Sequence, residues 1–365
     1  MKIGIDAFGC AHGQSGCGAY LLNFIKNIPK TDECNFELFG LEMDRYTYTA
    51  DKEIPFTSVS IDDNMRAIRR WHKRGLKKFC RRNKYDVVLF PAASDVLPGK
   101  LKTKSVLIMN GTCASIQNKK ERKIFKKALL HSSLIITASQ FIKDELVELG
   151  YDEQKIKAIH NGIDHKVFFP LADTDSEFID IKPFAIKRPY FIYSSRLSNE
   201  SKKHLELIKA FELFKQHTNA PHRLVLAGSD GEYTEEIHRA AYDSQYASEI
   251  LITGHFPQES LQKLYCGSAA CIFPAVNEGA GLPVTEAMAC GVPVLCSDKG
   301  ALKEMALDAP LYFDSENVEE IAVDMQKIVE DKALAKSMIQ KGYEVSHRIT
   351  WEYTVKETLA AVEKL

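Results

Sequence analysis

The stretch 273–298, FPAVNEGAGLPVTEAMACGVPVLCSD, combines two carboxylates with a glycine-rich loop. An apolar run typical of a buried strand ends at the loop, Pro283 suits the first turn of a following helix, and Gly291 suits its end. The N-terminus of such a helix attracts phosphates and sugar hydroxyls through its unpaired N–H groups and its dipole. Glu278 and Glu286 lie on either side of this pocket, where carboxylates accept hydrogen bonds from pairs of hydroxyl groups. The alternative is a pair of solvated carboxylates at helix ends.

A second candidate group follows the strand predicted at residues 190–195, in the sequence RLSNESKKHLELIKAF. Arg196 stands at the end of that strand, and Lys202 and Lys203 stand near the start of the next helix. A guanidinium and an ammonium held at neighbouring ends of secondary structure can converge on one diphosphate. For Lys203 and His204 we expect the simpler role of surface cations.

The elements that must position these residues alternate along the whole chain. Apolar and β-branched runs predict buried parallel strands, separated by amphipathic helical patterns such as His204–Gln216 and Val318–Val329. Repeated β–α units predict parallel sheets with helices on both faces. The predicted strands lie near Ile3 and at Asp86–Phe90, Ser105–Met109, Leu134–Ser139, Tyr190–Ser195, Arg223–Gly228, Ile250–Gly254, Ala269–Pro274 and Pro293–Ser297.

The chain has 365 residues, which is more than one hydrophobic core usually serves. A polar and acidic segment, LADTDSEFIDIKP, follows Pro170 and has the composition of a linker. We therefore predict two α/β domains, at 1–168 and at 169–350. The helix predicted at 351–365 is expected to pack back on the first domain.

Charge and cysteine usage bound the class of protein. Residues 1–170 contain 28 Lys and Arg against 19 Asp and Glu, whereas the remaining residues contain 20 against 30. The basic half can face anionic lipid, nucleic acid or an anionic substrate. Nine cysteines without CxxC pairs predict reduced thiols in the cytoplasm and no zinc site. No apolar run approaches the roughly 18–20 residues of a membrane span, and MKIGIDAFG is expected to form a strand rather than a signal peptide.

The frame NEGAGLPVTEAMACGVPVL resembles the EX7E signature of the retaining glycosyltransferases of family GT4. The resemblance implies an α/β protein of the GT-B fold, in which two Rossmann-like domains face each other across a deep interdomain cleft. It makes 1–168 the acceptor domain and 169–350 the nucleotide-sugar donor domain. It places Glu278 beside the donor sugar and Glu286 at the hydroxyls of the nucleotide ribose. Ala280 replaces an aromatic residue that is frequent in the family. The loop residues implied as backbone donors to the sugar and phosphates are Gly279, Ala280, Gly281 and Leu282.

The same resemblance covers nearly all of residues 135–365. It assigns the donor diphosphate to Arg196 and Lys202, and Lys202 fits better than Lys203 because the following helix then aligns. The segment Ile159–Pro170 is similar to the interdomain NG[VI]D segment of the family. Further nucleotide-sugar contacts are implied for Gly228, His255 and Phe256, which follow two other predicted strands.

The first half resembles the family more loosely. Gly16 and Gly18 fit a glycine pair that approaches the donor phosphates, and the absence of a clean GxGxxG with a spaced acid argues against a dehydrogenase. Asn110 stands where many members have a histidine that faces the donor sugar. An asparagine can bind a hydroxyl but cannot transfer a proton as histidine does. His12, near the glycine loop, is a candidate substitute.

Residues Met65–Lys84, MRAIRRWHKRGLKKFCRRNK, contain ten Lys and Arg and no acid. They are typical of a basic amphipathic helix, with Trp71 on its apolar face and Gly75 weakening it, that lies on anionic lipid. The alternative is a solvated helix whose apolar face packs on its own domain. A second basic cluster, Lys119–Lys127, supports membrane contact. No recognised nucleic-acid motif accompanies the charge, so we predict no nucleic-acid partner.

The sequence therefore predicts a cytoplasmic hexosyltransferase, peripheral on the inner face of the plasma membrane if the basic helix binds lipid. It would move a sugar from a GDP- or UDP-sugar to a glycan or lipid-linked acceptor in cell-surface polysaccharide or glycolipid synthesis. No cofactor or metal is expected, and Asp173 and Asp175, which resemble a metal-binding DxD motif, are interpreted as surface charge in the linker. Two alternatives stay open: an inactive nucleotide-sugar-binding protein, and an epimerase or phosphorylase on the GT-B fold.

Overall fold

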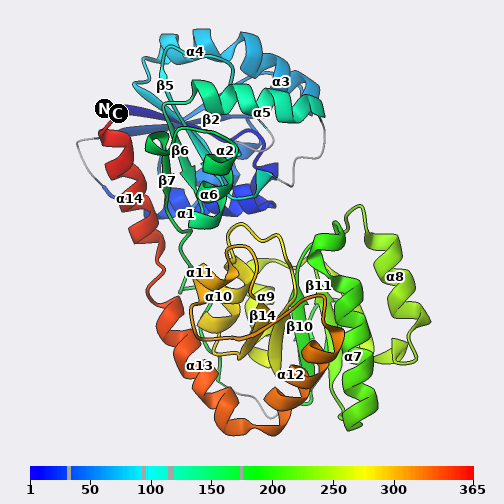
Figure 1. Cartoon of the computed structure of the whole chain (residues 1–365). Helices are drawn as coiled ribbons and strands as arrows, with labels where there is room; N and C mark the ends of the chain where they lie inside the picture. Colours follow the sequence, from blue (N-terminus) through cyan, green and yellow to red (C-terminus); the bar gives the residue numbers. More distant parts are fainter. Residues whose placement is uncertain (31–33, 93–95, 97, 114–118, 173–175) are drawn as a thin grey trace. The chain divides into compact units, whose positions relative to one another are not determined.

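The computed structural model describes residues 1–30, 34–92, 96, 98–113, 119–172 and 176–365, which form two compact units (Figure 1). Unit 1 comprises Met1–Gly162 with Thr350–Leu365, and unit 2 comprises Ile163–Ile349. The boundary predicted from the sequence, between residues 168 and 169, lies slightly later in the chain than this one. Asp173 and Asp175 lie outside the described residues. No helix in the described ranges is long and apolar enough to cross a bilayer.

Unit 1 is built on a parallel seven-stranded sheet in the order β3-β2-β1-β4-β5-β6-β7, with helices covering it (Figure 1). Its strands are β1 (Lys2–Asp6), β2 (Asn35–Gly40), β3 (Phe56–Ser58), β4 (Val87–Phe90), β5 (Lys104–Met109), β6 (Leu134–Thr137) and β7 (Ile156–Ala158). Its α-helices are α1 (Gly16–Asn27), α2 (Asp44–Thr49), α3 (Met65–Arg74), α4 (Leu76–Asn83), α5 (Lys119–His131), α6 (Gln140–Glu148) and α14 (Trp351–Glu363).

Unit 2 is built on a parallel six-stranded sheet in the order β12-β11-β10-β13-β14-β15, with a separate antiparallel hairpin, β8-β9. Its strands are β8 (Phe178–Ile181), β9 (Phe184–Lys187), β10 (Tyr190–Ser194), β11 (Arg223–Ala227), β12 (Ile250–Gly254), β13 (Ala270–Phe273), β14 (Val294–Ser297) and β15 (Leu311–Phe313). Its α-helices are α7 (His204–Thr218), α8 (Thr234–Asp243), α9 (Gln258–Gly267), α10 (Leu282–Ala289), α11 (Leu302–Ala306), α12 (Val318–Glu330) and α13 (Lys332–Ser346).

Both sheets reverse their strand order beside the first strand. In unit 1 the reversal lies between β1 and β4, and in unit 2 it lies between β10 and β13. The chain leaves the two strands of such a pair toward opposite sides, which opens a crevice at their carboxyl ends where α/β proteins bind ligands. The predicted α/β class with two Rossmann-like units is confirmed.

Two predicted elements were wrong in detail. The acidic segment interpreted as a linker contains strand β8, which forms a hairpin with β9 directly after the segment; Ile181 and Ile186 of the two strands alternate inward with charged neighbours and are buried. The single basic helix is two helices, α3 and α4, which meet at Gly75. There a Cβ would lie 2.7 Å from the Trp71 ring, so only glycine fits the junction without displacing that ring.

The last helix, α14, belongs to unit 1. Trp351 is buried and its ring lies 5.3 Å from that of Tyr20 on α1. The Thr354 hydroxyl donates to the carbonyl of His160 at 2.7 Å. Gly162 must be glycine here, because a Cβ would lie 2.1 Å from the Trp351 nitrogen.

The inner face of α3 is fixed by a buried pair between His72 and Asp6. His72 Nε2 lies 2.7 Å from Asp6 Oδ2, Nδ1 lies 2.8 Å from the carbonyl of Ile68, and both side chains of the pair are at most 2% exposed. The other Asp6 oxygen accepts from the Phe8 backbone N–H at 2.9 Å. This network ties α3 to the carboxyl end of β1. The glycine-rich segment of unit 1 follows directly after that strand.

We expect His72→Ala to destabilise unit 1 by about 3–5 kcal/mol, because it leaves the Asp6 carboxyl buried without its partner. Chemical denaturation followed by circular dichroism measures the free energy of unfolding. The exposed Lys73→Ala on the same helix is the control and should change stability by less than about 0.5 kcal/mol. A loss below about 1 kcal/mol for His72→Ala would show that the pair contributes little beyond packing.

Candidate functional site

The candidate site of unit 2 lies where the strand order reverses, and an ion pair marks it. Lys202 follows β10 and Glu278 follows β13, two strands that pair directly. Lys202 Nζ lies 2.9 Å from Glu278 Oε2, with the two side chains 20% and 15% exposed. The structure thus brings together two residues that are 76 positions apart in the chain: one predicted to bind the diphosphate and one predicted to bind the sugar.

Backbone and buried side-chain contacts hold the two loops side by side. The Val276 N–H donates to the carbonyl of Ser201 at 2.9 Å. The hydroxyl of Tyr193, a buried residue of β10, donates to the carbonyl of Lys202 at 2.7 Å. No motif in the sequence indicated either contact, since a strand tyrosine and a loop amide carry no specific signal.

The glycine-rich loop enters α10 as the sequence predicted. Gly281 precedes the helix with a φ of 64°, a conformation that favours glycine, and Pro283 lies in the first turn. The Gly281 N–H points at Glu278 Oε1, 3.4 Å away. Glu278 is held from the other side, where its carbonyl accepts from the Ala301 N–H at 2.9 Å. Gly300 is required beside it, because a Cβ there would lie 2.6 Å from the same carbonyl oxygen.

Glu286 lies in α10 and is half-buried. Burial raises the pKa of its carboxyl to about 8, so the group is largely uncharged at neutral pH. The buried Tyr265 of α9 lies close to it: burial, and then the Glu286 charge, raises the pKa of the tyrosine well above its usual value. The Tyr265 hydroxyl has no hydrogen-bond partner among the described residues.

The expectation that Lys203 and His204 are surface cations was wrong. Lys203 Nζ forms ion pairs with Glu206 at 3.1 Å and Glu316 at 2.6 Å, and its side chain is 12% exposed. His204 is buried against the ring of Tyr193, 4.7 Å between centroids, and burial lowers the pKa of His204 to about 4. It is therefore neutral, and Lys202 rather than Lys203 faces Glu278.

The remaining predicted residues of unit 2 follow neighbouring strands. Arg196 is exposed, and its Nε donates to the carbonyl of Asp230 at 3.1 Å; within the described part it forms no ion pair with either glutamate. Gly228 is packed against the Ser195 carbonyl, and its N–H donates to the Gly254 carbonyl at 2.9 Å.

The two residues after β12 differ in their environment. His255 is exposed, whereas Phe256 is buried with its ring 5.9 Å from that of Phe184 in the β8-β9 hairpin. Of these two residues, His255 is the one that presents its side chain to solvent. Ala280, in the glycine-rich loop, is 7% exposed, and Leu282 is half-buried.

The predicted residues of unit 1 occupy the corresponding sheet edge. Gly16 begins α1 in open space, whereas a Cβ on Gly18 would lie 2.4 Å from the Cys10 carbonyl. Ser15 caps α1 by accepting from the Gly18 N–H at 3.1 Å. His12 forms a 2.7 Å ion pair with Asp44, whose hydrogen bond raises the pKa of His12.

Asn110 follows β5 and is held by the NGID segment. Its Oδ1 accepts from Asn161 Nδ2 at 2.9 Å, and Asn161 is 2% exposed. The Asn110 Nδ2 is buried and makes no hydrogen bond in the described ranges of the chain. The amide thus has a donor without a partner among the described residues, at the position where many members of the resembled family have a histidine.

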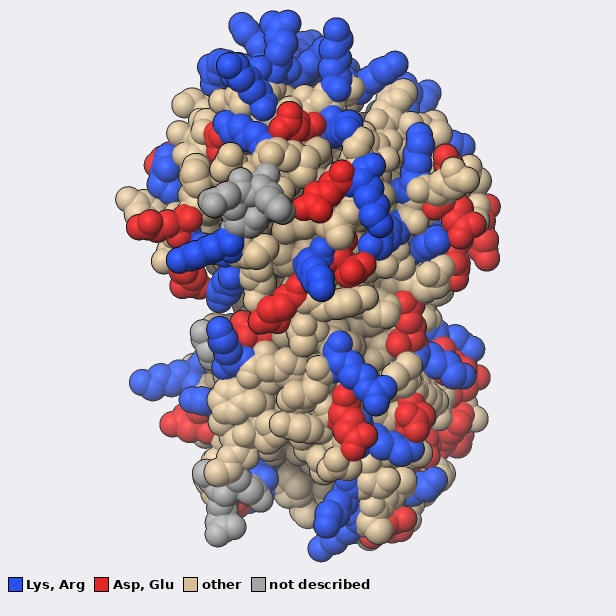
Figure 2. Space-filling view, turned by 90° about the vertical axis from the view of Figure 1, so that its left-hand side faces the viewer, with Lys and Arg blue, Asp and Glu red and all other residues tan. Residues whose placement is uncertain are grey.

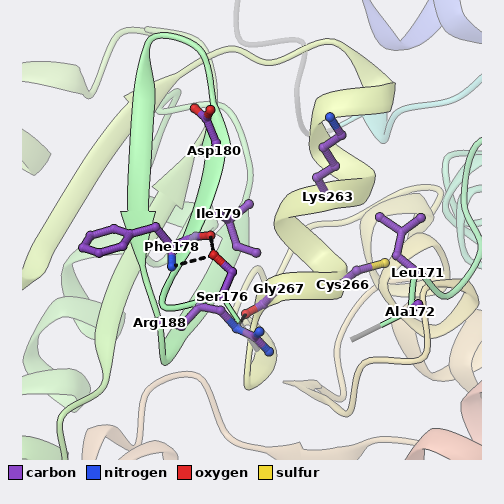
Figure 3. Close-up of a pocket in the computed structure, with 10 residues that line it drawn as sticks. All are labelled: Leu171, Ala172, Ser176, Phe178, Ile179, Asp180, Arg188, Lys263, Cys266 and Gly267. Atoms are coloured by element: carbon purple, nitrogen blue, oxygen red, sulfur yellow. Dashed lines mark hydrogen bonds between the residues drawn. The ribbon is translucent and has the colours of Figure 1, made fainter. Parts of the chain in front are cut away.

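A separate cavity of about 370 Å³ lies between the β8-β9 hairpin and α9 (Figure 3). Its lining includes Phe178, Lys263 and Cys266 but none of the predicted site residues. Arg188 closes one edge, with its Nε donating to the Gly267 carbonyl at 3.1 Å. Over the described residues, no three His, Cys, Asp or Glu side chains are grouped so that they could hold a metal ion.

The raised pKa of Glu286 predicts a pH dependence of stability. The folded state retains the proton up to about pH 8, whereas the unfolded carboxyl loses it near 4.5, so stability should fall as pH rises through that window. Glu286→Gln should flatten this fall. Melting temperatures at several pH values between these limits measure it, with Glu319→Gln on α12, an exposed residue, as the control. Parallel curves for wild type and Glu286→Gln would contradict the assignment.

Comparison with known families and proteins extends these findings. The family model described as "Glycosyl transferases group 1" matches residues 175–345, and that described as "Glycosyltransferase Family 4" matches residues 16–167. The chain is 26% identical over 260 residues to O-antigen chain mannosyltransferase B of Escherichia coli, covering 70% of this chain and 68% of that protein. It is 28% identical over 169 residues to the serotype-specific mannosyltransferase WbdA of Escherichia coli, covering 46% of this chain and only 21% of WbdA.

Solved structures agree on the fold. The Anabaena protein HepE, crystallised with UDP and glucose, superimposes with a TM-score of 0.77 at 16% identity, with 100% of both chains covered. Sucrose-phosphate synthase from Thermosynechococcus elongatus gives 0.76 at 16% identity, covering 100% of this chain and 98% of that one. The GT-B fold is confirmed, and the chain belongs to the group 1 glycosyltransferases as a GT4-type transferase.

Proposed function

We propose that this glycosyltransferase moves a sugar, with retention of configuration, from a nucleoside diphosphate sugar to a glycan or lipid-linked acceptor in the synthesis of a cell-surface polysaccharide or glycolipid. The observation that carries the proposal is the Lys202–Glu278 pair at the reversal point of the unit 2 sheet, beside the N-terminus of α10. The names of the O-antigen mannosyltransferase relatives favour mannose as the sugar and a polysaccharide as the product.

In the proposed reaction Lys202 neutralises charge on the departing diphosphate. An ammonium in a partly desolvated loop interacts more strongly with that charge than an ammonium in water. Arg196, exposed at the end of β10, adds a second cation when it leaves the Asp230 carbonyl. Glu278 accepts hydrogen bonds from hydroxyls of the sugar. Glu286, beside the buried Tyr265, accepts hydrogen bonds from hydroxyls of the ribose. The leaving phosphate takes the acceptor proton, and no metal or cofactor takes part.

We expect Lys202→Met to lower kcat/KM for sugar transfer by about 100-fold to 1,000-fold, because it removes one donor to the charge that develops on the leaving group. The measurement is nucleotide release from GDP- and UDP-sugars in the presence of an acceptor lipid extract. NMR of the product gives the anomeric configuration.

Lys203→Met is the matched control, since Lys203 is the neighbouring residue but pairs with Glu206 and Glu316. It should retain activity within about threefold. Equal losses for the two variants would contradict the assignment of Lys202. Nucleotide binding without transfer by the wild-type protein would favour the alternative of an inactive binding protein.

We also propose peripheral contact with an anionic membrane at the cytoplasmic face, in an electrostatic form. Figure 2 shows Lys and Arg side chains gathered over α3 and α4 at one end of unit 1, and all ten cations of Met65–Lys84 are exposed. Apart from Met65, which is 39% exposed, the apolar side chains are not available to lipid: Ile68, Leu76 and Phe79 are buried, and the Trp71 ring packs against Phe8 and Phe39. We therefore expect α3 and α4 to be attracted to an anionic membrane without inserting into it.

Binding to phosphatidylglycerol vesicles should therefore be lost when NaCl rises from about 0.05 M to about 0.5 M, as charges become screened. Lys77→Glu with Arg81→Glu should weaken it at least about tenfold, since each cation near the surface contributes about 1 kcal/mol. The same reversal at Lys332 and Lys336 of α13 is the control. Salt-resistant binding, or quenching of Trp71 by a lipid-borne quencher, would contradict an electrostatic contact.

A further inference from the structure

The two residues proposed to bind the donor hold each other in the structure. Lys202 Nζ and Glu278 Oε2 are 2.9 Å apart, and both side chains are largely withdrawn from water. The Gly281 N–H supplies a second, weaker contact to the other carboxylate oxygen at 3.4 Å. The carboxylate proposed for the sugar is thus already satisfied, and the ammonium proposed for the diphosphate already has an anionic partner.

Both partners are anchored through their backbones rather than through the ion pair alone. The Lys202 carbonyl accepts from the Tyr193 hydroxyl at 2.7 Å, and the Glu278 carbonyl accepts from the Ala301 N–H at 2.9 Å. The Val276 N–H joins the two loops through the Ser201 carbonyl. Breaking the ion pair therefore requires only side-chain rotation, because these backbone contacts persist.

A diphosphate that approaches Lys202 meets Glu278 as a competitor. Two anions share one ammonium poorly, because like charges at contact distance repel each other in a partly desolvated site. A nucleoside diphosphate without sugar would displace the carboxylate from Lys202 and leave it only the weak contact with the Gly281 N–H. A sugar diphosphate brings hydroxyls that can replace Lys202 as donors to the carboxylate.

We propose that Lys202 exchanges partners during the reaction cycle, from Glu278 to the donor diphosphate and back, so that the ion pair favours the intact donor over the spent nucleoside diphosphate. This inference rests on the proposed function. On donor binding, Glu278 turns to the sugar hydroxyls. After transfer the sugar leaves Glu278, the ion pair forms again, and the diphosphate loses its contact with Lys202. The ion pair thus promotes product release.

Glu278→Gln tests the exchange, because glutamine keeps the shape and a hydrogen-bond acceptor but no longer competes for the ammonium. Calorimetry of UDP and GDP should show about threefold to tenfold tighter binding to this variant, the range expected for loss of a partly exposed ion pair. The difference in binding affinity between a nucleotide-sugar and its nucleoside diphosphate should become smaller in this variant. Glu206→Gln, which relieves Lys203 of one partner, is the matched control and should leave both affinities unchanged.

The Lys202→Met background separates partner exchange from plain repulsion. If exchange operates, Glu278→Gln should lose most of its tightening effect there, giving a coupling between the two positions. The exchange would be overturned if Glu278→Gln tightened nucleoside diphosphate binding equally with and without Lys202, or did not tighten it when Lys202 is present. Either result would leave the proposed function standing. Absence of any nucleotide or nucleotide-sugar binding by the wild-type protein would overturn the proposed function, and the exchange with it.

Discussion

The constraint on which the site depends is the adjacency of β10 and β13 in a parallel sheet. Their carboxyl ends lie side by side, yet the chain leaves them toward opposite neighbours in the strand order. Loops that are far apart in sequence must therefore meet over a crevice, and each brings a charged residue to it. The Lys202–Glu278 ion pair is the direct outcome of this topology, and the link between Val276 and Ser201 fixes its geometry.

Close backbone approach supports this arrangement at several points. Gly228, Gly281 and Gly300 occupy positions where a side chain would meet a carbonyl oxygen or where φ is positive. The loops can thus lie near enough to one another for side chains of ordinary length to converge. The two carboxylates differ in their surroundings: Glu278 is paired with a cation, whereas burial raises the pKa of Glu286 to about 8.

The basic helices of unit 1, α3 and α4, separate their apolar side chains from their charged ones. Their apolar side chains build the domain core, through the Trp71 cluster and the buried His72–Asp6 pair, while their cations remain outside. The same amphipathic pattern fits lipid insertion and self-packing equally well. Burial decided between them, because an apolar face that is already covered gains nothing from a bilayer.

The sequence by itself determined the class of fold, the interior strands and the EX7E frame, because buried parallel strands and a strand–loop–helix junction have local signatures. It did not indicate the β8-β9 hairpin, whose charged outer residues mimic a linker, and it marked Gly75 only as a weak point of one basic helix rather than as a break between two. It favoured Lys202 over Lys203, but only the tertiary structure showed which ammonium faces Glu278 and that His204 is neutral and buried. Partner choice and burial are properties of neighbours distant in the chain, and no local pattern of residues specifies them.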